Sequence, residues 1–286
     1  MTARGVGIGL RRDHFAEIAT IGAARALTGL DFVEIIPENY VGCGGRARAV
    51  LDDVRAQMPV LVHGVSLSVG GPEPLDVEWL SALKTFCDAL EVPFVTEHLS
   101  FASARGVAFH ELLPLPMSDA CVAHVVERVR LTTQVLERAL LLENPSALAR
   151  MPGDLDEGRF TTRVLEESGA SLLLDVNNVY VTAMNTGLDP RALLASMPLS
   201  RVRQIHVAGH RAIEGALVDT HEGPVSDPVL SLLDVAVRRC GDVPVLLEWD
   251  THIPPLARVK EEAARVRAVV ESARATDGVR ATEATP

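Results

Sequence analysis

The chain has 286 residues, of which 48% are hydrophobic, so it can bury a large core as one big α/β domain or two smaller ones. Its formal net charge is -11 and it has no run of basic residues, which argues against a mainly electrostatic grip on nucleic acid. The first residues lack an apolar segment followed by a small-residue cleavage site, and no uncharged run approaches the roughly 20 residues that span a bilayer. We therefore expect no signal peptide, no membrane span and no nucleic-acid partner.

The four cysteines are scattered along the chain and form no C-x-x-C pair: Cys43, Cys87, Cys121 and Cys240. Isolated cysteines of this kind are typical of free thiols in a reducing compartment. This pattern favours a cytoplasmic location.

Short apolar segments alternate with amphipathic segments along the chain, as expected for a parallel sheet covered by helices. We predict eight strands, at residues 5–11, 32–36, 60–68, 94–101, 139–146, 171–178, 202–210 and 243–251. The predicted helix N-caps are Asp76, Ser118, Asp189 and Asp227. Gly169 and Gly241 stand where helices are expected to end.

Eight strand–helix units match the size and order of a (β/α)8 barrel. The predicted helix-to-strand connections are short, whereas several strand-to-helix connections are long: residues 64–75, 102–117, 179–188 and 208–226. Long loops on this one face are typical of a catalytic barrel. A doubly wound open sheet is the alternative, but no G-x-G-x-x-G follows the first strand. We predict one TIM-barrel domain over residues 1–272, followed by a small, polar and flexible C-terminal tail at residues 273–286.

The segment from Val202 to His221 contains three histidines and an aspartate at and beyond the end of an apolar strand. An extended backbone at Asp219-Thr220-His221 would put the Asp219 and His221 side chains on one face. A solvated, His-rich loop would explain the segment alone. The other predicted strands also end in histidines and carboxylates, however, and this repetition favours a polynuclear metal site.

In a barrel, the carboxyl ends of all strands meet at one rim. The side chains brought to this rim include Glu34, Glu38, His63, Glu97, His98, Glu143, Asp175, Asn177, His206, His210, Asp219, His221, Glu248 and Asp250. A buried carboxylate costs several kcal/mol unless it is paired or ligates a metal. Few lysines or arginines are available to neutralise Glu143, Asp175, Asp219 and Glu248, so we expect two or three divalent cations. Imidazole, carboxylate and amide ligands without thiolate suit iron, manganese or zinc.

Some neighbouring residues compete for the same role. Glu97 and His98 point to opposite faces of a regular strand, and we favour His98 as the ligand. Asn177 shares a face with Asp175 and is preferred to Asn178. His210 joins His206 only if the intervening V-A-G segment turns.

These motifs together resemble the multinuclear non-heme iron-dependent oxidases, a family formerly catalogued as uncharacterised TIM-barrel proteins. The resemblance covers nearly the whole chain, through G-I-G-L-R, E-I-I-P-E-N-Y, H-G-V-S-L-S-V-G-G, T-E-H-L-S-F, L-L-E-N-P-S, L-D-V-N-N-V-Y, H-V-A-G-H, D-T-H-E-G-P-V and L-L-E-W-D. Glu222 departs from the family pattern, in which glycine is expected directly after the histidine of D-T-H.

The resemblance implies an oxygenase that holds two or three iron ions (Fe2+/Fe3+) and uses O2 as co-substrate. The implied substrate is a ribosomally synthesised precursor peptide, with cysteine as the modified residue, and a separately encoded partner protein presents the peptide. The implied metal ligands are His63, His98, Glu143, Asp175, Asn177, His206, His210, Asp219, His221 and Glu248.

Two other functional classes are compatible with the same residues. A trinuclear zinc hydrolase or phosphodiesterase, or a sugar isomerase, would use a similar ligand set on a TIM barrel. The acidic net charge counts against a DNA substrate. A non-catalytic metal- or peptide-binding protein is the third class, and the near-complete ligand set argues against it.

Overall fold

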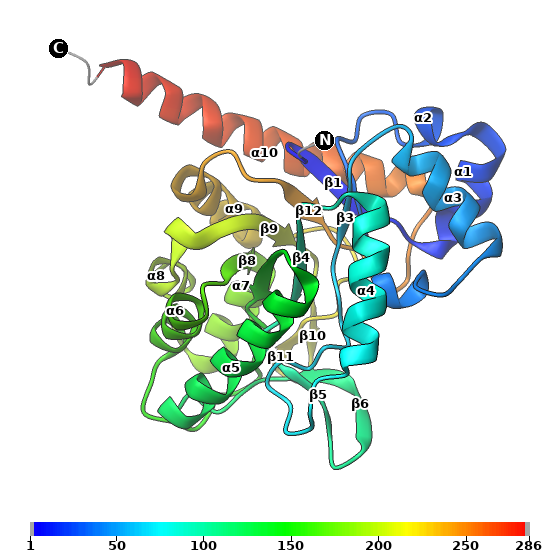
Figure 1. Cartoon of the computed structure of the whole chain (residues 1–286). Helices are drawn as coiled ribbons and strands as arrows, with labels where there is room; N and C mark the ends of the chain where they lie inside the picture. Colours follow the sequence, from blue (N-terminus) through cyan, green and yellow to red (C-terminus); the bar gives the residue numbers. More distant parts are fainter. Residues whose placement is uncertain (1–2, 284–286) are drawn as a thin grey trace.

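The computed structural model describes residues 3–283, with the backbone alone for His110 and residues 276–283. Eight parallel strands form an almost closed barrel in the order β3–β2–β1–β12–β9–β8–β7–β4, with helices around it (Figure 1). A parallel bridge between His63 and Thr96 links the two strands at the ends of this order. The predicted (β/α)8 barrel is confirmed.

All eight predicted strands are present, and each is shorter than predicted at its carboxyl end. They are β1 Val6–Gly9, β2 Val33–Ile35, β3 Val60–Val62, β4 Phe94–His98, β7 Ala139–Glu143, β8 Ser171–Asp175, β9 Val202–Val207 and β12 Val245–Leu247. Three strands end on a predicted site residue: β4 at His98, β7 at Glu143 and β8 at Asp175. The chain therefore leaves the sheet directly after placing a polar side chain at the rim.

Ten α-helices and three short 3-10 helices fill the described connections. The α-helices are α1 Phe15–Ile21, α2 Ala23–Ala26, α3 Gly45–Arg55, α4 Val77–Leu90, α5 Asp119–Leu136, α6 Glu157–Ser168, α7 Val176–Thr186, α8 Pro190–Ser196, α9 Asp227–Cys240 and α10 Leu256–Glu283. The 3-10 helices are η1 Arg12–His14, η2 Pro37–Asn39 and η3 Leu199–Arg201. The predicted caps Asp76, Ser118 and Asp189 accept hydrogen bonds from the first turns of their helices. The predicted cap at Asp227 is wrong by one residue, because Ser226 is the N-cap of α9 and Asp227 is its first helical residue.

Two β-hairpins, which the sequence did not reveal, occupy the longest strand-to-helix connections. β5 Phe101–Ala104 pairs with β6 Val107–Leu113 after β4, and β10 Arg211–Ile213 pairs with β11 Ala216–Val218 after β9. Figure 1 shows the β5–β6 hairpin projecting beyond the barrel. Both hairpins follow the carboxyl ends of strands and so belong to the face where the polar residues gather.

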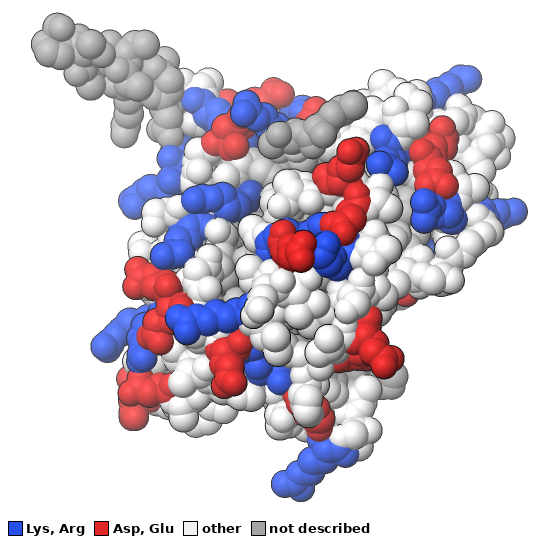
Figure 2. Space-filling view, in the orientation of Figure 1, with Lys and Arg blue, Asp and Glu red and all other residues white. Residues whose placement is uncertain are grey.

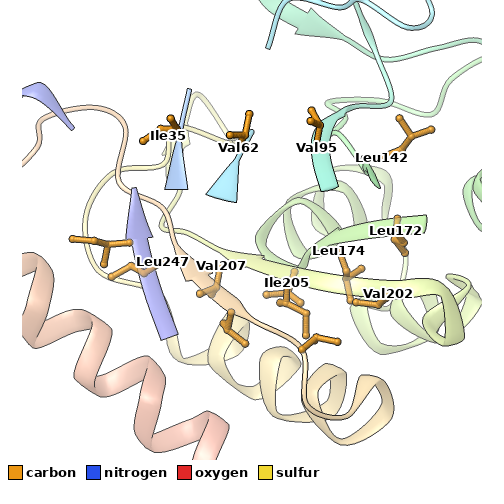
Figure 3. Close-up of a cluster of buried hydrophobic side chains, with 14 of the residues drawn as sticks. Ile35, Val62, Val95, Leu142, Leu172, Leu174, Val202, Ile205, Val207 and Leu247 are labelled. Carbon is orange, nitrogen blue, oxygen red and sulfur yellow. The ribbon is translucent and has the colours of Figure 1, made fainter. Parts of the chain in front are cut away.

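The core lies between the outer face of the barrel and the helices. Alternate strand residues belong to it, and Figure 3 labels ten of them: Ile35, Val62, Val95, Leu142, Leu172, Leu174, Val202, Ile205, Val207 and Leu247. The intervening residues face the opposite side, because side chains alternate along a strand. Inside the barrel, Phe32, Leu61 and Leu246 form a separate small apolar cluster with Ala3. This cluster fills the interior beneath the polar rim.

The segment predicted to be a flexible tail is helical up to Glu283 and continues α10 beyond the barrel (Figure 1). Its small residues, mainly alanine and threonine, are compatible with helix. The flexibility of this segment stays a prediction, and its last three residues lie outside the described residues. Within residues 3–283, no helix has the length and apolar character to cross a bilayer. Acidic and basic side chains are interspersed on the face shown in Figure 2.

Candidate metal centre

Six buried ionisable side chains stand at the carboxyl ends of six barrel strands. They are His63, His98, Glu143, Asp175, His206 and Glu248. The register places His98 beside Glu143 and Asp175 beside His206 on neighbouring strands. Every one of these residues was predicted from the sequence to share the site, and the structure brings all six together.

Glu143 is at the centre of the group. Its Oε2 atom lies 3.3 Å from Nε2 of His63, 3.4 Å from Nε2 of His98 and 3.8 Å from Nδ1 of His206. The same Nδ1 atom of His206 lies 3.1 Å from Oε2 of Glu248. Imidazole nitrogens and carboxylate oxygens therefore converge on one small volume.

Several of these converging atoms lack a well-directed hydrogen bond although they are fully buried. They are both carboxylate oxygens of Glu143, Oδ2 of Asp175, Nδ1 of His206, Nε2 of His221 and Oε2 of Glu248. Buried polar atoms are nearly always hydrogen-bonded, and an unpaired buried carboxylate is costly. A group of unbonded oxygens and nitrogens facing one another is the arrangement that bound cations stabilise.

Three sets of side chains have ligand atoms within 4.8 Å of one another, the span of a metal site. The sets are His63, Glu143 and His206; Glu143, Asp175, His206 and Glu248; and His221, Glu248 and Asp250. Glu143, His206 and Glu248 each belong to two sets, so the sets adjoin and could together hold more than one ion. The donors are imidazole and carboxylate, which suit iron, manganese or zinc.

Without metal, the site retains protons. Burial raises the pKa of Glu143 to about 7, against the opposing charges of His98 and His206. Burial and the Glu143 charge raise the pKa of Asp175 well above its usual value. Burial lowers the pKa of His98, but Glu143 and Glu97 outweigh it and raise this pKa to about 9. These protons take the place of cations, so metal binding must displace them.

Each of four histidines has one ring nitrogen beside an oxygen outside the Glu143 group. His63 Nδ1 lies 2.8 Å from Oγ1 of Thr96, and His98 Nδ1 lies 3.3 Å from Oε1 of Glu97. His206 Nε2 lies 3.1 Å from Oε1 of Glu34, and His221 Nδ1 lies 3.2 Å from Oδ2 of Asp250. In His63, His98 and His206 the other nitrogen faces Glu143. This arrangement of acceptor, imidazole and metal-facing nitrogen is common in metalloproteins.

Asp219 and His221 come from the connection between β11 and α9. Oδ1 of Asp219 lies 2.9 Å from Nε2 of His221, so the predicted pair does converge. The predicted extended backbone is wrong, because His221 has a φ of 46°, in the left-handed region. This turn directs the His221 ring toward Glu248, 3.3 Å away.

Asn177 and His210 form an outer part of the site. Asn177 donates a hydrogen bond of 2.6 Å to Oδ1 of Asp219, and its own Oδ1 lies 2.7 Å from Nδ1 of His210. The His210 ring packs on Tyr180, with ring centroids 5.3 Å apart. Asn178 instead binds Asp175 and Asn144 and stabilises the start of α7. His210 is therefore connected to the Asp219 carboxylate through the side chain of Asn177.

The structure adds site residues that sequence reasoning did not select. Asp250 belongs to the predicted rim but not to the predicted ligand set; it contacts Arg11, whose guanidinium lies over Gly9 because that residue has no Cβ. Glu34 also belongs to the predicted rim, whereas Gln204 is outside it; both face the barrel interior next to His206. The spacing of these residues could have identified them. Asp250 stands two residues after Glu248 and Gln204 two residues before His206, and residues two apart on an extended strand share a face.

A cavity of about 260 Å3 opens above this group. Its wall includes Arg11, His98, Asp219 and, from the β5–β6 hairpin, Glu111 and Leu112. The cavity is large enough for a side chain and a few flanking atoms, and its floor is the cluster of unbonded donors.

The sequence matches a known family. The model of the family described as "RiPP precursor modification enzyme MbnB/TglH/ChrH" matches residues 5–271. The chain belongs to this family. The resemblance inferred from the motifs is confirmed, since its relatives carry the former family name UPF0276.

Curated relatives match most of the chain. A UPF0276 protein of Pseudomonas aeruginosa is 45% identical over 264 residues, which are 92% of this chain and 91% of that protein. A UPF0276 protein of an Anaeromyxobacter strain is 43% identical over 270 residues, or 94% of this chain and 93% of that protein.

Solved structures of lower identity share the barrel. L-ribulose 3-epimerase is 15% identical, with a TM-score of 0.62 over 100% of both chains. The IOLI protein with a bound zinc atom is 12% identical, with a TM-score of 0.61 over 94% of this chain and 98% of that chain. At these identities, the likeness supports the fold alone.

Glu222, the departure from the expected family motif, has a structural role of its own. Its carboxylate lies 2.8 Å from Nε of Arg211 and 2.6 Å from Nδ1 of His252. It links the β10–β11 hairpin to the connection after β12, next to the unusual backbone of His221.

Proposed function

We propose that the protein is an iron-dependent oxidase that uses O2 to modify cysteine residues of a ribosomally synthesised precursor peptide. Family membership supports a peptide-modifying enzyme. The observation that carries the metal proposal is Glu143: both of its buried oxygens lack hydrogen bonds, and its Oε2 lies within 3.8 Å of three imidazoles. The donor set is compatible with iron.

Ten residues form the proposed ligand set. Six are the strand-end residues His63, His98, Glu143, Asp175, His206 and Glu248, and four are the outer residues Asn177, His210, Asp219 and His221. Two or three ions fit this set, because it divides into a group around Glu143 and a group around Asp219 and His221. Asp250 is an added candidate through its proximity to His221 and Glu248.

Bound iron would supply the activation of O2, which protein side chains alone do not provide. The protein's own contribution is to hold the ions and to admit one side chain of the substrate to the cavity of about 260 Å3. A peptide meets this requirement because an extended chain can place one residue inside while its flanks lie outside. We also propose a cytoplasmic enzyme with a separately encoded partner that presents the peptide.

The test combines metal analysis with a peptide assay. Protein purified without oxygen from iron-supplemented cells should hold more than one iron per chain and show a mixed-valence Mössbauer signal. Incubation with a cysteine-containing precursor peptide, its partner protein and O2 should change the peptide mass, and omission of O2 should prevent the change. Stoichiometric zinc that persists after attempted iron reconstitution would instead support hydrolytic chemistry and overturn the proposal.

A further inference from the structure

The β5–β6 hairpin is a two-stranded sheet of its own, separate from the barrel sheet (Figure 1). Within residues 3–283 no third strand pairs with it, so each of its strands has an outer edge without a strand partner. The backbone N–H and C=O groups of such an edge can pair with a further strand. β6 is seven residues long and exposes two apolar side chains, Val107 by 57% and Phe109 by 38%. The hairpin is therefore suited to bind an extended chain.

The pairing inside the hairpin is interrupted in the middle of β6. The two neighbours of Ala102 in β5 pair with Ala108 and Leu113 of β6. Ala102 alone therefore stands opposite residues 109–112, and its N–H donates instead to Oγ of Ser68 at 2.9 Å. One β5 residue cannot satisfy the N–H and C=O groups of four β6 residues. This part of β6 thus has backbone groups available for a second partner.

The same part of β6 reaches the metal centre. Glu111 and Leu112 belong to the wall of the cavity of about 260 Å3, whose floor is the group of converging donors. A strand paired with residues 109–112 would therefore run past the mouth of this cavity. The cavity has room for a side chain and a few flanking atoms, so a folded protein on this edge could not also fill it. An extended peptide could occupy both.

We propose that residues 109–112 of β6 are the docking site of the substrate peptide, which pairs with them as an added strand and places its cysteine in the cavity. The proposal rests on the proposed function, because it requires a peptide substrate. Strand addition supplies affinity through backbone hydrogen bonds, and the side chains of alternate residues supply specificity.

The exposed apolar side chains of β6 determine what the peptide carries beside its cysteine. The Phe109 ring packs edge-on against Phe101, with ring centroids 6.1 Å apart, and Val107 is exposed two residues earlier. Paired strands advance together by about 3.3 Å per residue. Because Phe109 and Val107 precede Leu112 by three and five residues, we expect bulky apolar residues about three to five positions from the cysteine.

The first experiment selects a peptide ligand and measures its affinity. Random peptides with one fixed central cysteine, displayed on phage, are selected against the full chain purified without oxygen, and the best binder is synthesised with a fluorescent label. We expect Phe109→Ser to weaken its binding about 10-fold in fluorescence anisotropy, because an apolar contact is lost. Leu131→Ser is the matched control, since Leu131 is 42% exposed on α5 and outside the cavity wall. The control should bind the peptide like the wild type.

Methylation of the peptide backbone distinguishes strand pairing from a purely apolar contact. N-methyl groups at alternate residues block one edge of the added strand and leave the N–H groups of the other edge intact. Of two peptides methylated at the two alternate sets of residues, one should bind about 10-fold more weakly than the other. Equal affinities would overturn strand pairing. This comparison uses the unaltered protein, so it does not depend on the folding of a variant.

The remaining outcomes separate docking from catalysis and from other occupants. Binding of the selected peptide without modification of any precursor peptide would overturn the proposed function and leave the docking site. An unchanged KM for a precursor peptide in Phe109→Ser, or a pool that yields no binder, would overturn the docking site alone. Self-association of the wild type that is lost in Phe109→Ser, with unchanged peptide binding, would assign the edge to a second copy of the chain and overturn the proposal.

Discussion

Oε2 of Glu143 lies 3.3 Å from Nε2 of His63, and neither oxygen of this carboxylate has a hydrogen-bond donor. A salt bridge would require a proton on His63, but burial and the charge of His98 lower the pKa of His63 well below its usual value. His63 is therefore a neutral imidazole beside Glu143. Such a contact is weak in itself and becomes favourable when a cation lies between the two groups.

Metal removal should lower the melting temperature. A ligand at one hundred times its dissociation constant stabilises the folded state by about 2.7 kcal/mol, and each kcal/mol corresponds to about 2–4 °C for domains somewhat smaller than this chain. We expect a fall of several degrees by differential scanning calorimetry after chelation, reversed when iron is restored. An unchanged curve after verified metal removal would contradict the structural role of the site.

Metal-free protein should lose stability as pH rises through the neutral range. The folded-state pKa of Glu143 is raised from 4.5 to about 7, so its contribution is present below pH 4.5 and lost by about pH 7. The pKa of His98 is raised from 6.5 to about 9, so its contribution is lost between these pH values. Urea denaturation at pH 5, 7 and 9 measures the decline, while Co2+ affinity should rise over pH 7–9 because protons compete less.

Glu143→Gln should separate metal binding from folding. The amide carries no buried charge, so we expect the metal-free variant to be at least as stable as the wild type at pH 8. Its metal-dependent rise in melting temperature should disappear, because the central donor is lost. A metal-bound variant with wild-type ion stoichiometry would show that Glu143 is not a ligand.

Asp219→Ala should lose metal and activity together. Asp219 contacts both His221 and Asn177, so its removal affects the outer group and leaves the Glu143 group in place. We expect the iron content per chain to fall by about one ion. Asp154→Ala, at an exposed loop position, is the control. Full metal occupancy in Asp219→Ala would remove Asp219 from the ligand set.

Arg128→Met should loosen the connection that follows His63. The Arg128 guanidinium donates to the carbonyl oxygens of Ser68, Val69 and Glu73 at 3.0, 2.8 and 2.5 Å. Loss of these bonds should cost about 2–4 kcal/mol in the free energy of unfolding, measured with urea. His124→Ala, which removes one contact with Gly71, should cost about 1 kcal/mol. Equal values for both variants would contradict the proposed anchoring by Arg128.

The barrel was predictable because its strands are buried on both faces and read as continuous apolar segments. The hairpin strands were not predicted, because β5 and β10 consist of half-buried or exposed residues and contain no continuous apolar run. Their pairing depends on the turn at Gly106 or Gly215, which brings two short segments together. Sequence periodicity carries little information about such segments.

The strand-end residues were predictable because parallel strands bring their carboxyl ends to one rim. The partners of those residues were harder to predict. The roles of Glu34 and Arg11 depend on which residue of a distant strand lies opposite, and that register is a property of the closed barrel. His210 illustrates the same limit: its distance from Glu143 is decided by the chain reversal after β9, and its contact with the site passes through Asn177.

The β5–β6 hairpin supplies Glu111 and Leu112 to the cavity wall and exposes Val107 and Phe109, yet it contributes none of the converging donors. The proposed reactive centre and the entrance to it therefore belong to separate parts of the chain. A change in the hairpin would alter the wall of the cavity and leave the donors on the strands in place. An engineer seeking altered selectivity would begin with the hairpin.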